Sequence, residues 1–206
     1  MDDIKDKTEY LSKKYHSRYE KSVYVDKTWT IPNILTFSRL VALPVLVYTL
    51  FHLDRLGPIP TIAIGGYMFV SDLLDGVLAK AMGQISIVGA IADPVIDKVV
   101  IDTLAVTFAI IGWLPVWAVS LIILRDLGIV AFGVKIYLRY GTLVTPVFLG
   151  RITPLAWGAV FITAFAYMDV LKWTFLSIAM VLTVVSGYLY YSRYSELIAK
   201  NERDIE

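Results

Sequence analysis

The chain has 206 residues, of which 57% are hydrophobic and 18% are charged, and its formal net charge is +1. A mean hydropathy of +0.67 is typical of a protein with several membrane-spanning helices, and the absence of cysteine excludes a disulfide framework. We expect partners in the lipid bilayer and among small molecules, and no nucleic acid.

Residues 1–31 are polar and charged, and they hold seven of the 19 Lys and Arg residues. The segment has no apolar core of a signal peptide, and its acidic residues disfavour a mitochondrial transit peptide. Leu11, Tyr15 and Tyr19 are spaced by four and would form a weak apolar stripe on a helix. The segment is therefore either an interfacial helix at the membrane surface or a flexible, solvated tail.

From Pro32 onward, six apolar segments follow, each near the length that a bilayer requires. We predict an all-α, integral membrane bundle of six transmembrane helices in one domain, residues 32–194, followed by a polar tail at 195–206. The predicted spans are residues 33–53, 59–80, 88–111, 114–138, 152–168 and 172–192.

The distribution of basic residues predicts the orientation of these spans. With six spans, both termini and the loops after spans two and four lie on one side, which then carries thirteen Lys and Arg residues. The opposite side carries only Arg55 and Lys172. The positive-inside rule therefore predicts cytoplasmic termini.

Span one begins with polar side chains that are unexpected on a lipid-facing helix: Asn33, Thr36 and Arg39. These residues either line a site, or Asn33 and Thr36 cap the helix while Arg39 extends to the membrane surface. We favour a functional role for Arg39 and leave the other two open.

Spans two and three hold four carboxylates, Asp72, Asp75, Asp93 and Asp97. Ionised groups inside a membrane are costly unless they meet one another, water or a cation. The two aspartates of each span share one helix face, and the short connection around Gly83 makes the spans antiparallel neighbours. We expect the four carboxylates to converge near the cytoplasmic side.

Four carboxylates in one pocket need counter-charges, because like charges raise one another's pKa. Mg²⁺ or Mn²⁺, which prefer oxygen ligands, would supply them, and two ions are plausible. Gly76 and Ala79 lie beside the aspartates, where small side chains would admit a ligand. Alternatively, they only allow helices to approach closely.

Later helices carry four cations that would suit an anionic second substrate: Arg125, Lys135, Arg139 and Arg151. Asp126, next to Arg125, is expected to point elsewhere, so that each would need its own partner. The alternative is a structural ion pair for Arg125 and the positive-inside bias for Arg151. Tyr188, Tyr190, Tyr191 and Tyr194 are interpreted as an aromatic belt.

One motif resembles the signature of the CDP-alcohol phosphotransferase family of membrane enzymes in phospholipid synthesis: Asp72-x2-Asp75-Gly76-x2-Ala79-Lys80-x8-Gly89-x3-Asp93-x3-Asp97. Only Lys80 departs from it, because the family has Arg there. The resemblance implies metal binding by the four aspartates, with Asp97 as general base, and frequent homodimers. It also implies a nucleotide site of Asn33, Thr36, Arg39, Asp75, Gly76, Ala79 and Lys80.

The resemblance covers about residues 31–194 and looks like the phosphatidylglycerophosphate synthase and cardiolipin synthase branch. It implies transfer of a phosphatidyl group from CDP-diacylglycerol, or an archaeal ether-linked equivalent, to an alcohol with release of CMP. We favour glycerol 3-phosphate as acceptor, with Arg125, Lys135, Arg139 and Arg151 binding its phosphate, and keep phosphatidylglycerol as the alternative. A cation- or proton-coupled transporter is the rival from another class, although no second copy of the aspartate motif is present.

Overall fold

The computed structural model describes residues 30–81, 87–140 and 148–203, and all regular structure in these ranges is helical. The helices are α2 (Ile31–Phe51), α3 (Leu53–Leu56), α4 (Pro58–Ala81), α5 (Ile87–Ile111), α6 (Val116–Tyr140), α7 (Phe148–Phe165) and α8 (Asp169–Arg203). The prediction of an all-α chain is confirmed for the described ranges. The predicted N-terminal segment lies outside them up to residue 29.

Three described stretches are long and apolar enough to cross a membrane: Asn33–Phe51, Val116–Ile136 and Asp169–Glu196. Two further stretches, Pro58–Leu74 and Ile152–Phe165, are apolar but shorter. These helices are consistent with an integral membrane protein, and the count of six spans stays a prediction. The boundaries of the predicted domain and tail are likewise untested, although α8 continues as a helix to Arg203.

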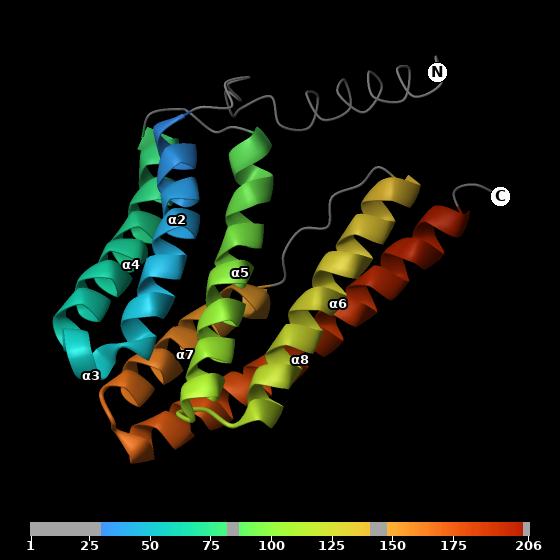
Figure 1. Ribbon diagram of the computed structural model, residues 1–206. Coiled ribbons are helices and arrows are strands. Elements are labelled where there is room, and N and C mark those ends of the chain that lie inside the picture. The colour runs from blue at the N-terminus through green and yellow to red at the C-terminus, as the bar shows by residue number, and fades with distance from the viewer. Residues whose placement is uncertain (1–29, 82–86, 141–147, 204–206) are drawn as a thin grey trace. The chain divides into compact units, whose positions relative to one another are not determined.

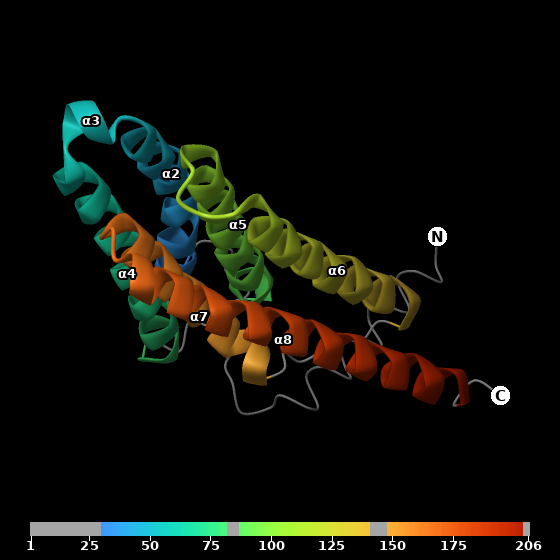
Figure 2. The same cartoon turned by 90° about the horizontal axis from the view of Figure 1, so that it is seen from below.

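The chain divides into two compact units, residues 1–100 and 101–206, with the boundary inside α5. In the first unit, α2 and α4 pack side by side and α3 connects them at one end (Figures 1 and 2). The side chain of Thr30 accepts a hydrogen bond from Asn33 N (3.4 Å) and caps the start of α2. Directly after α3, Gly57 has φ +72°, which ends this helix and allows the chain to turn into α4.

In the second unit, α8 packs against both α6 and α7 (Figures 1 and 2). Its packing face follows helical spacing, because Ala179, Thr183, Ser186 and Tyr190 are all buried. Trp157 of α7 is fully buried and donates its indole N–H to Thr183 Oγ1 (3.2 Å). This contact satisfies the polar end of a large core side chain.

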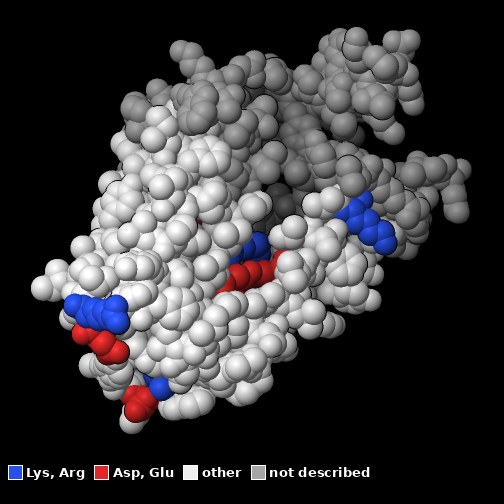
Figure 3. All heavy atoms as spheres, viewed as in Figure 1, with Lys and Arg blue, Asp and Glu red and all other residues white. Residues whose placement is uncertain are grey.

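Many large apolar side chains remain exposed on the helices, including Ile59, Leu124 and Val170. On the face drawn in Figure 3, charged side chains of the described residues form a few isolated groups among uncharged ones. Exposed apolar surface of this extent marks a face that contacts a partner or a membrane. Lipid contact explains it in a chain with several apolar helices.

Candidate functional site

Arg39 of α2 connects three helices of the first unit through one nitrogen atom. Its Nη1 lies 2.5 Å from Asp72 Oδ1 on α4 and 2.6 Å from Asp97 Oδ1 on α5. The Arg39 side chain is only 4% exposed, whereas those of Asp72 and Asp97 are 46% and 41% exposed. A buried cation therefore holds two accessible carboxylates toward each other.

This geometry brings together two of the four predicted carboxylates. Because Asp72 Oδ1 and Asp97 Oδ1 contact the same nitrogen, they lie no farther apart than the two contact distances combined. Asp75 and Asp93 belong to α4 and α5, three and four positions from Asp72 and Asp97, which places their backbones on the same helix faces. Their side chains lie outside the described residues.

The polar residues at the start of α2 are buried. Asn33, Thr36 and Arg39 recur every three residues and are all buried, so they form one stripe on the helix. The side chain that caps α2 belongs to Thr30. Arg39 is buried in ion pairs, so the alternative in which it extends to the membrane surface is wrong.

The donor chemistry at Arg39 fits a divalent metal. Carboxylate oxygens from two helices already converge on one positive group, and such oxygens are the ligands of Mg²⁺ and Mn²⁺. Among the side chains that the structure describes, no three His, Cys, Asp or Glu residues are grouped so that they could hold a metal ion, and Asp75 and Asp93 are not in that set. Metal binding by all four aspartates stays a prediction.

The other predicted nucleotide-binding residues are Gly76, Ala79 and Lys80. All three lie in the second half of α4, and their side-chain surroundings are outside the described residues. Their place on the aspartate-bearing helix is thus known, and their roles stay predictions.

Arg125 of α6 is a buried cation of the second unit. Its Nη1 lies 2.5 Å from Asp126 Oδ1, and its Nη2 donates to Ser186 Oγ on α8 (3.0 Å). The prediction that Asp126 would point elsewhere is wrong, because the long Arg125 side chain curves back to its neighbour. A structural ion pair, which was the alternative for Arg125, therefore exists. Arg125 Nε is buried and has no hydrogen-bond partner among the described atoms.

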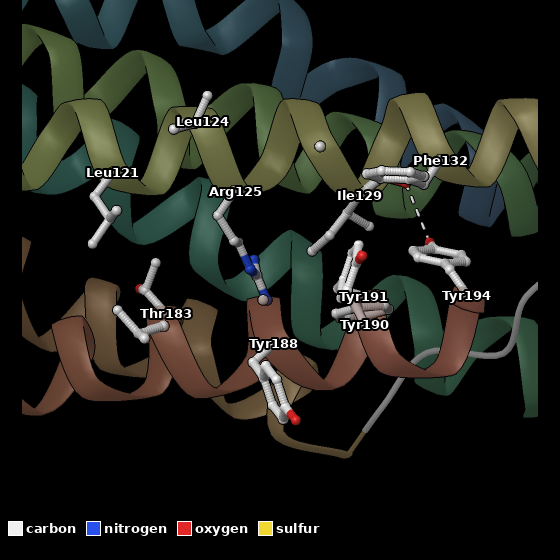
Figure 4. A pocket seen from close by; sticks show the side chains of 13 residues that line it. Leu121, Leu124, Arg125, Ile129, Phe132, Thr183, Tyr188, Tyr190, Tyr191 and Tyr194 are labelled. Carbon is white, nitrogen blue, oxygen red and sulfur yellow. Dashed lines mark hydrogen bonds between the residues drawn. The ribbon is translucent and has the colours of Figure 1, made fainter. Parts of the chain in front are cut away.

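A pocket of about 280 Å³ adjoins Arg125 between α6 and α8. Figure 4 shows Arg125 extending from α6 toward α8, with Leu121 and Ile129 on the same helix. The hydroxyl of Tyr194 donates to the Ile129 carbonyl (3.2 Å), the dashed contact in Figure 4. Most of the other lining side chains are apolar or aromatic, so the pocket combines one guanidinium group with a hydrocarbon surface.

The remaining predicted phosphate-binding cations are not brought together by the described side chains. Lys135 is exposed on α6. Arg139 lies near the end of α6 and Arg151 near the start of α7, but their side chains are outside the described set.

Sequence reasoning missed Ser186 and Tyr190 of α8 as neighbours of Arg125. Tyr190 and Tyr194 are buried, whereas Tyr188 and Tyr191 are exposed. An aromatic belt at the membrane surface is therefore compatible only with Tyr188 and Tyr191 of this group. The four-residue spacing of Ser186, Tyr190 and Tyr194 is a signal of one shared helix face. Nothing in the sequence shows that this face meets α6.

A family model described as CDP-alcohol phosphatidyltransferase matches residues 29–185. That match spans the helices that carry Arg39, Asp72 and Asp97, and it covers most of the chain. The chain belongs to the CDP-alcohol phosphatidyltransferase family. The resemblance inferred from the aspartate motif is thereby confirmed, and the family is one of transferases in phospholipid synthesis.

Curated relatives carry two different names. A cardiolipin synthase (CMP-forming) of Rattus norvegicus is 36% identical over 122 residues, 59% of this chain and 39% of that protein. A probable phosphatidylglycerophosphate synthase of Mycobacterium tuberculosis (strain ATCC 25618 / H37Rv) is 28% identical over 179 residues, 79% of this chain and 80% of that protein. The chain therefore spans about 39% of the length of the cardiolipin synthase that it matches. The two similarities favour neither name strongly.

Proposed function

We propose that this protein transfers a phosphatidyl group from a CDP-diacylglycerol-type lipid to an alcohol, with release of CMP. Family membership supports the reaction class. The structural observation that carries the proposal is the convergence of Asp72 and Asp97 on Arg39. It brings together one carboxylate from α4 and one from α5, which is in keeping with a site that binds a diphosphate and its counter-ions.

In the proposed reaction, the acceptor oxygen forms a bond to the phosphatidyl phosphorus, and the bond from that phosphorus to the bridging oxygen breaks. CMP leaves with the bridging oxygen. Asp97 takes the proton of the attacking hydroxyl. Its 41% exposed side chain is accessible to an incoming alcohol, and the contact with Arg39 orients its carboxylate.

The proposed site would bind two divalent ions, Mg²⁺ or Mn²⁺, through the carboxylates of Asp72, Asp75, Asp93 and Asp97. When bound, the metal would neutralise charge on the diphosphate and on the departing CMP. Asn33, Thr36, Gly76, Ala79 and Lys80 would complete the nucleotide site, in keeping with the family motif. Lys80 in place of Arg keeps the positive charge and lacks the planar bidentate geometry.

We propose glycerol 3-phosphate as the acceptor. Its phosphate would bind Arg125, Lys135, Arg139 and Arg151, and the buried Nε of Arg125 offers a donor for one phosphate oxygen. The similarity to a probable phosphatidylglycerophosphate synthase over 79% of the chain is in keeping with this acceptor.

Phosphatidylglycerol is the second candidate. The pocket beside Arg125 is lined mostly by apolar and aromatic side chains, which favours an acceptor that carries acyl chains. The name of the rat relative points the same way.

The proposed enzyme crosses the bilayer six times, with its termini and aspartates at the cytoplasmic side. Three long apolar helices and two shorter ones are in keeping with this arrangement. A homodimer is proposed from the family resemblance alone.

The decisive experiment supplies the purified full chain with CDP-diacylglycerol, Mg²⁺ or Mn²⁺, and one acceptor per reaction. Glycerol 3-phosphate, phosphatidylglycerol, inositol phosphate and serine are compared in parallel, and released CMP is measured. CMP release with glycerol 3-phosphate supports the proposed acceptor. CMP release with phosphatidylglycerol alone would show that phosphatidylglycerol is the acceptor instead. If no acceptor yields CMP while cation flux into vesicles is observed, the transporter is the correct reading.

A further inference from the structure

Tyr190 of α8 lies between the buried cation of α6 and the first turn of α7. Its ring is beneath the Arg125 guanidinium, with Arg125 Cζ 5.8 Å from the ring centroid. The side chain is 8% exposed, and Figure 4 shows Arg125 directed from α6 toward the helix that carries Tyr190. A guanidinium at this distance from an aromatic face is attracted by the ring electrons.

The same tyrosine determines how closely α7 approaches α8. A Cβ atom added at Gly150 would lie 2.7 Å from Tyr190 Oη and 2.8 Å from Cε2, which is closer than carbon atoms tolerate. Glycine at position 150 therefore makes room for the Tyr190 ring. The next residue along α7 is Arg151, which we assign to the acceptor phosphate.

Ser186 strengthens the connection one helical turn before Tyr190. Its hydroxyl accepts a hydrogen bond from Arg125 Nη2 (3.0 Å) and one from Thr153 Oγ1 of α7 (3.4 Å). Residues four apart share a helix face. Ser186 and Tyr190 thus contact α6 and α7 from a single stripe of α8, which lies outside the aspartate motif.

We propose that Tyr190 is a positioning residue for acceptor binding. Its ring holds the Arg125 guanidinium in place, and its contact with Gly150 fixes the position of the first turn of α7. The inference rests on the proposed function, in which Arg125 and Arg151 bind the acceptor phosphate. It adds that α8, through a residue that touches no reacting atom, sets the affinity for the acceptor.

The test compares Tyr190→Leu with Tyr190→Phe in the purified full chain, with glycerol 3-phosphate as acceptor, or phosphatidylglycerol if only that lipid is consumed. Tyr190→Leu removes the aromatic face and is expected to raise the acceptor KM roughly tenfold. The KM for CDP-diacylglycerol and kcat should change little. Tyr190→Phe keeps the ring and should restore the acceptor KM to near the wild-type value.

A matched control is Tyr48→Leu on α2. Tyr48 is 57% exposed and is not among the residues that line the pocket beside Arg125. Its replacement removes an equal volume without disturbing Arg125, and the acceptor KM should stay at the wild-type value. An acceptor KM for Tyr190→Leu that equals this control would overturn the proposal. Equal increases in KM for both substrates would also overturn it, because general loosening predicts that result.

A second variant changes the contact between Tyr190 and Gly150 from the α7 side. It tests the role of Tyr190 if Tyr190→Leu does not fold. Gly150→Ala places a methyl group against the Tyr190 ring and should raise the acceptor KM. Gly158→Ala on the same helix meets nothing within 4 Å and should not. In the double variant Gly150→Ala/Tyr190→Leu, the acceptor KM should not exceed that of Tyr190→Leu alone, because the clash is gone.

Failure of this inference differs from failure of the proposed function. If the wild-type chain releases no CMP with any acceptor, the proposed function fails and this inference fails with it. If the wild-type chain is active, but both Tyr190→Leu and Gly150→Ala keep the wild-type acceptor KM, only the role of Tyr190 is rejected.

Discussion

Arg39 and Asp97 are 58 positions apart in the chain, and Arg39 Nη1 lies 2.6 Å from Asp97 Oδ1. The same nitrogen contacts Asp72, so the orientation of both carboxylates depends on a buried cation of α2. Preorganised groups of this kind are what a catalytic centre requires.

Replacing Asp97 by Asn should abolish turnover and leave much of the nucleotide binding. The amide keeps the shape of the side chain and cannot take the proton of the acceptor hydroxyl, so CMP release should fall by about 10²-fold to 10⁴-fold. Turnover is measured as CMP release, and binding is measured at equilibrium with CMP. Asp169→Asn, at a position whose side chain is 75% exposed, is the control and should keep wild-type turnover. Wild-type turnover in Asp97→Asn would refute the assignment of the base.

Replacing Arg39 by Ala should make stability more dependent on metal. Without the guanidinium, Asp72 and Asp97 face each other without this counter-charge, and the free energy of unfolding in EDTA should fall by about 1–3 kcal/mol. The lower part of this range is expected, because both carboxylates are more than a third exposed and water screens them. Thermal unfolding in EDTA and in Mn²⁺ measures the effect.

Mn²⁺ should raise the Tm of Arg39→Ala by more than it raises the Tm of the wild type, since it binds where repulsion is greatest. Arg55→Ala, at an exposed position of α3, serves as the control and should respond as the wild type does. The explanation is wrong if Arg39→Ala equals the wild type in EDTA.

Replacing Thr183 by Val should destabilise the second unit. Trp157 is fully buried and donates its indole N–H to Thr183 Oγ1, so Val leaves a buried donor without an acceptor at a cost of about 1–3 kcal/mol. Thermal unfolding of the purified protein measures the loss. Thr174→Val makes the same substitution on α8, where the exposed Thr174 donates to the Val170 carbonyl of its own helix, and should cost much less. Equal losses of stability in the two variants would show that the hydrogen bond from Trp157 to Thr183 does not stabilise the protein.

Single introduced cysteines can test the predicted orientation, because the natural chain has none. A membrane-impermeant thiol reagent should label Asp2→Cys, Gly83→Cys and Glu206→Cys from the cytoplasmic side of sealed vesicles. It should label Asp54→Cys, between α2 and α4, from the opposite side. Labelling of Asp54→Cys and Glu206→Cys from the same side would reject the six-span arrangement.

The positions of most helices follow from hydropathy and span length. The predicted span 59–80 corresponds to α4 (Pro58–Ala81), and 88–111 corresponds to α5 (Ile87–Ile111). The last predicted span ends at residue 192, and α8 continues beyond it to Arg203. Hydropathy detects the apolar part of a helix and not a polar continuation, which the backbone hydrogen bonds extend equally well.

The meeting of Asp72 with Asp97 could be anticipated from helical periodicity and a short connection. The place of Arg39 between them could not, because periodicity shows which face a residue occupies and not which neighbouring helix it meets. The ion pair of Arg125 with Asp126 depends on a side-chain conformation that the sequence does not determine. Burial of Tyr190 likewise depends on the packing of α8 against its neighbours.

The order of these charges along the chain matters for biogenesis. An aspartate at the centre of a helix that leaves the translocon costs about 2.5–3.5 kcal/mol. Arg39 precedes Asp72 and Asp97 in the chain and is therefore synthesised first. If the helices insert in chain order, the Arg39 guanidinium is available to pair with each aspartate as that aspartate enters the bilayer.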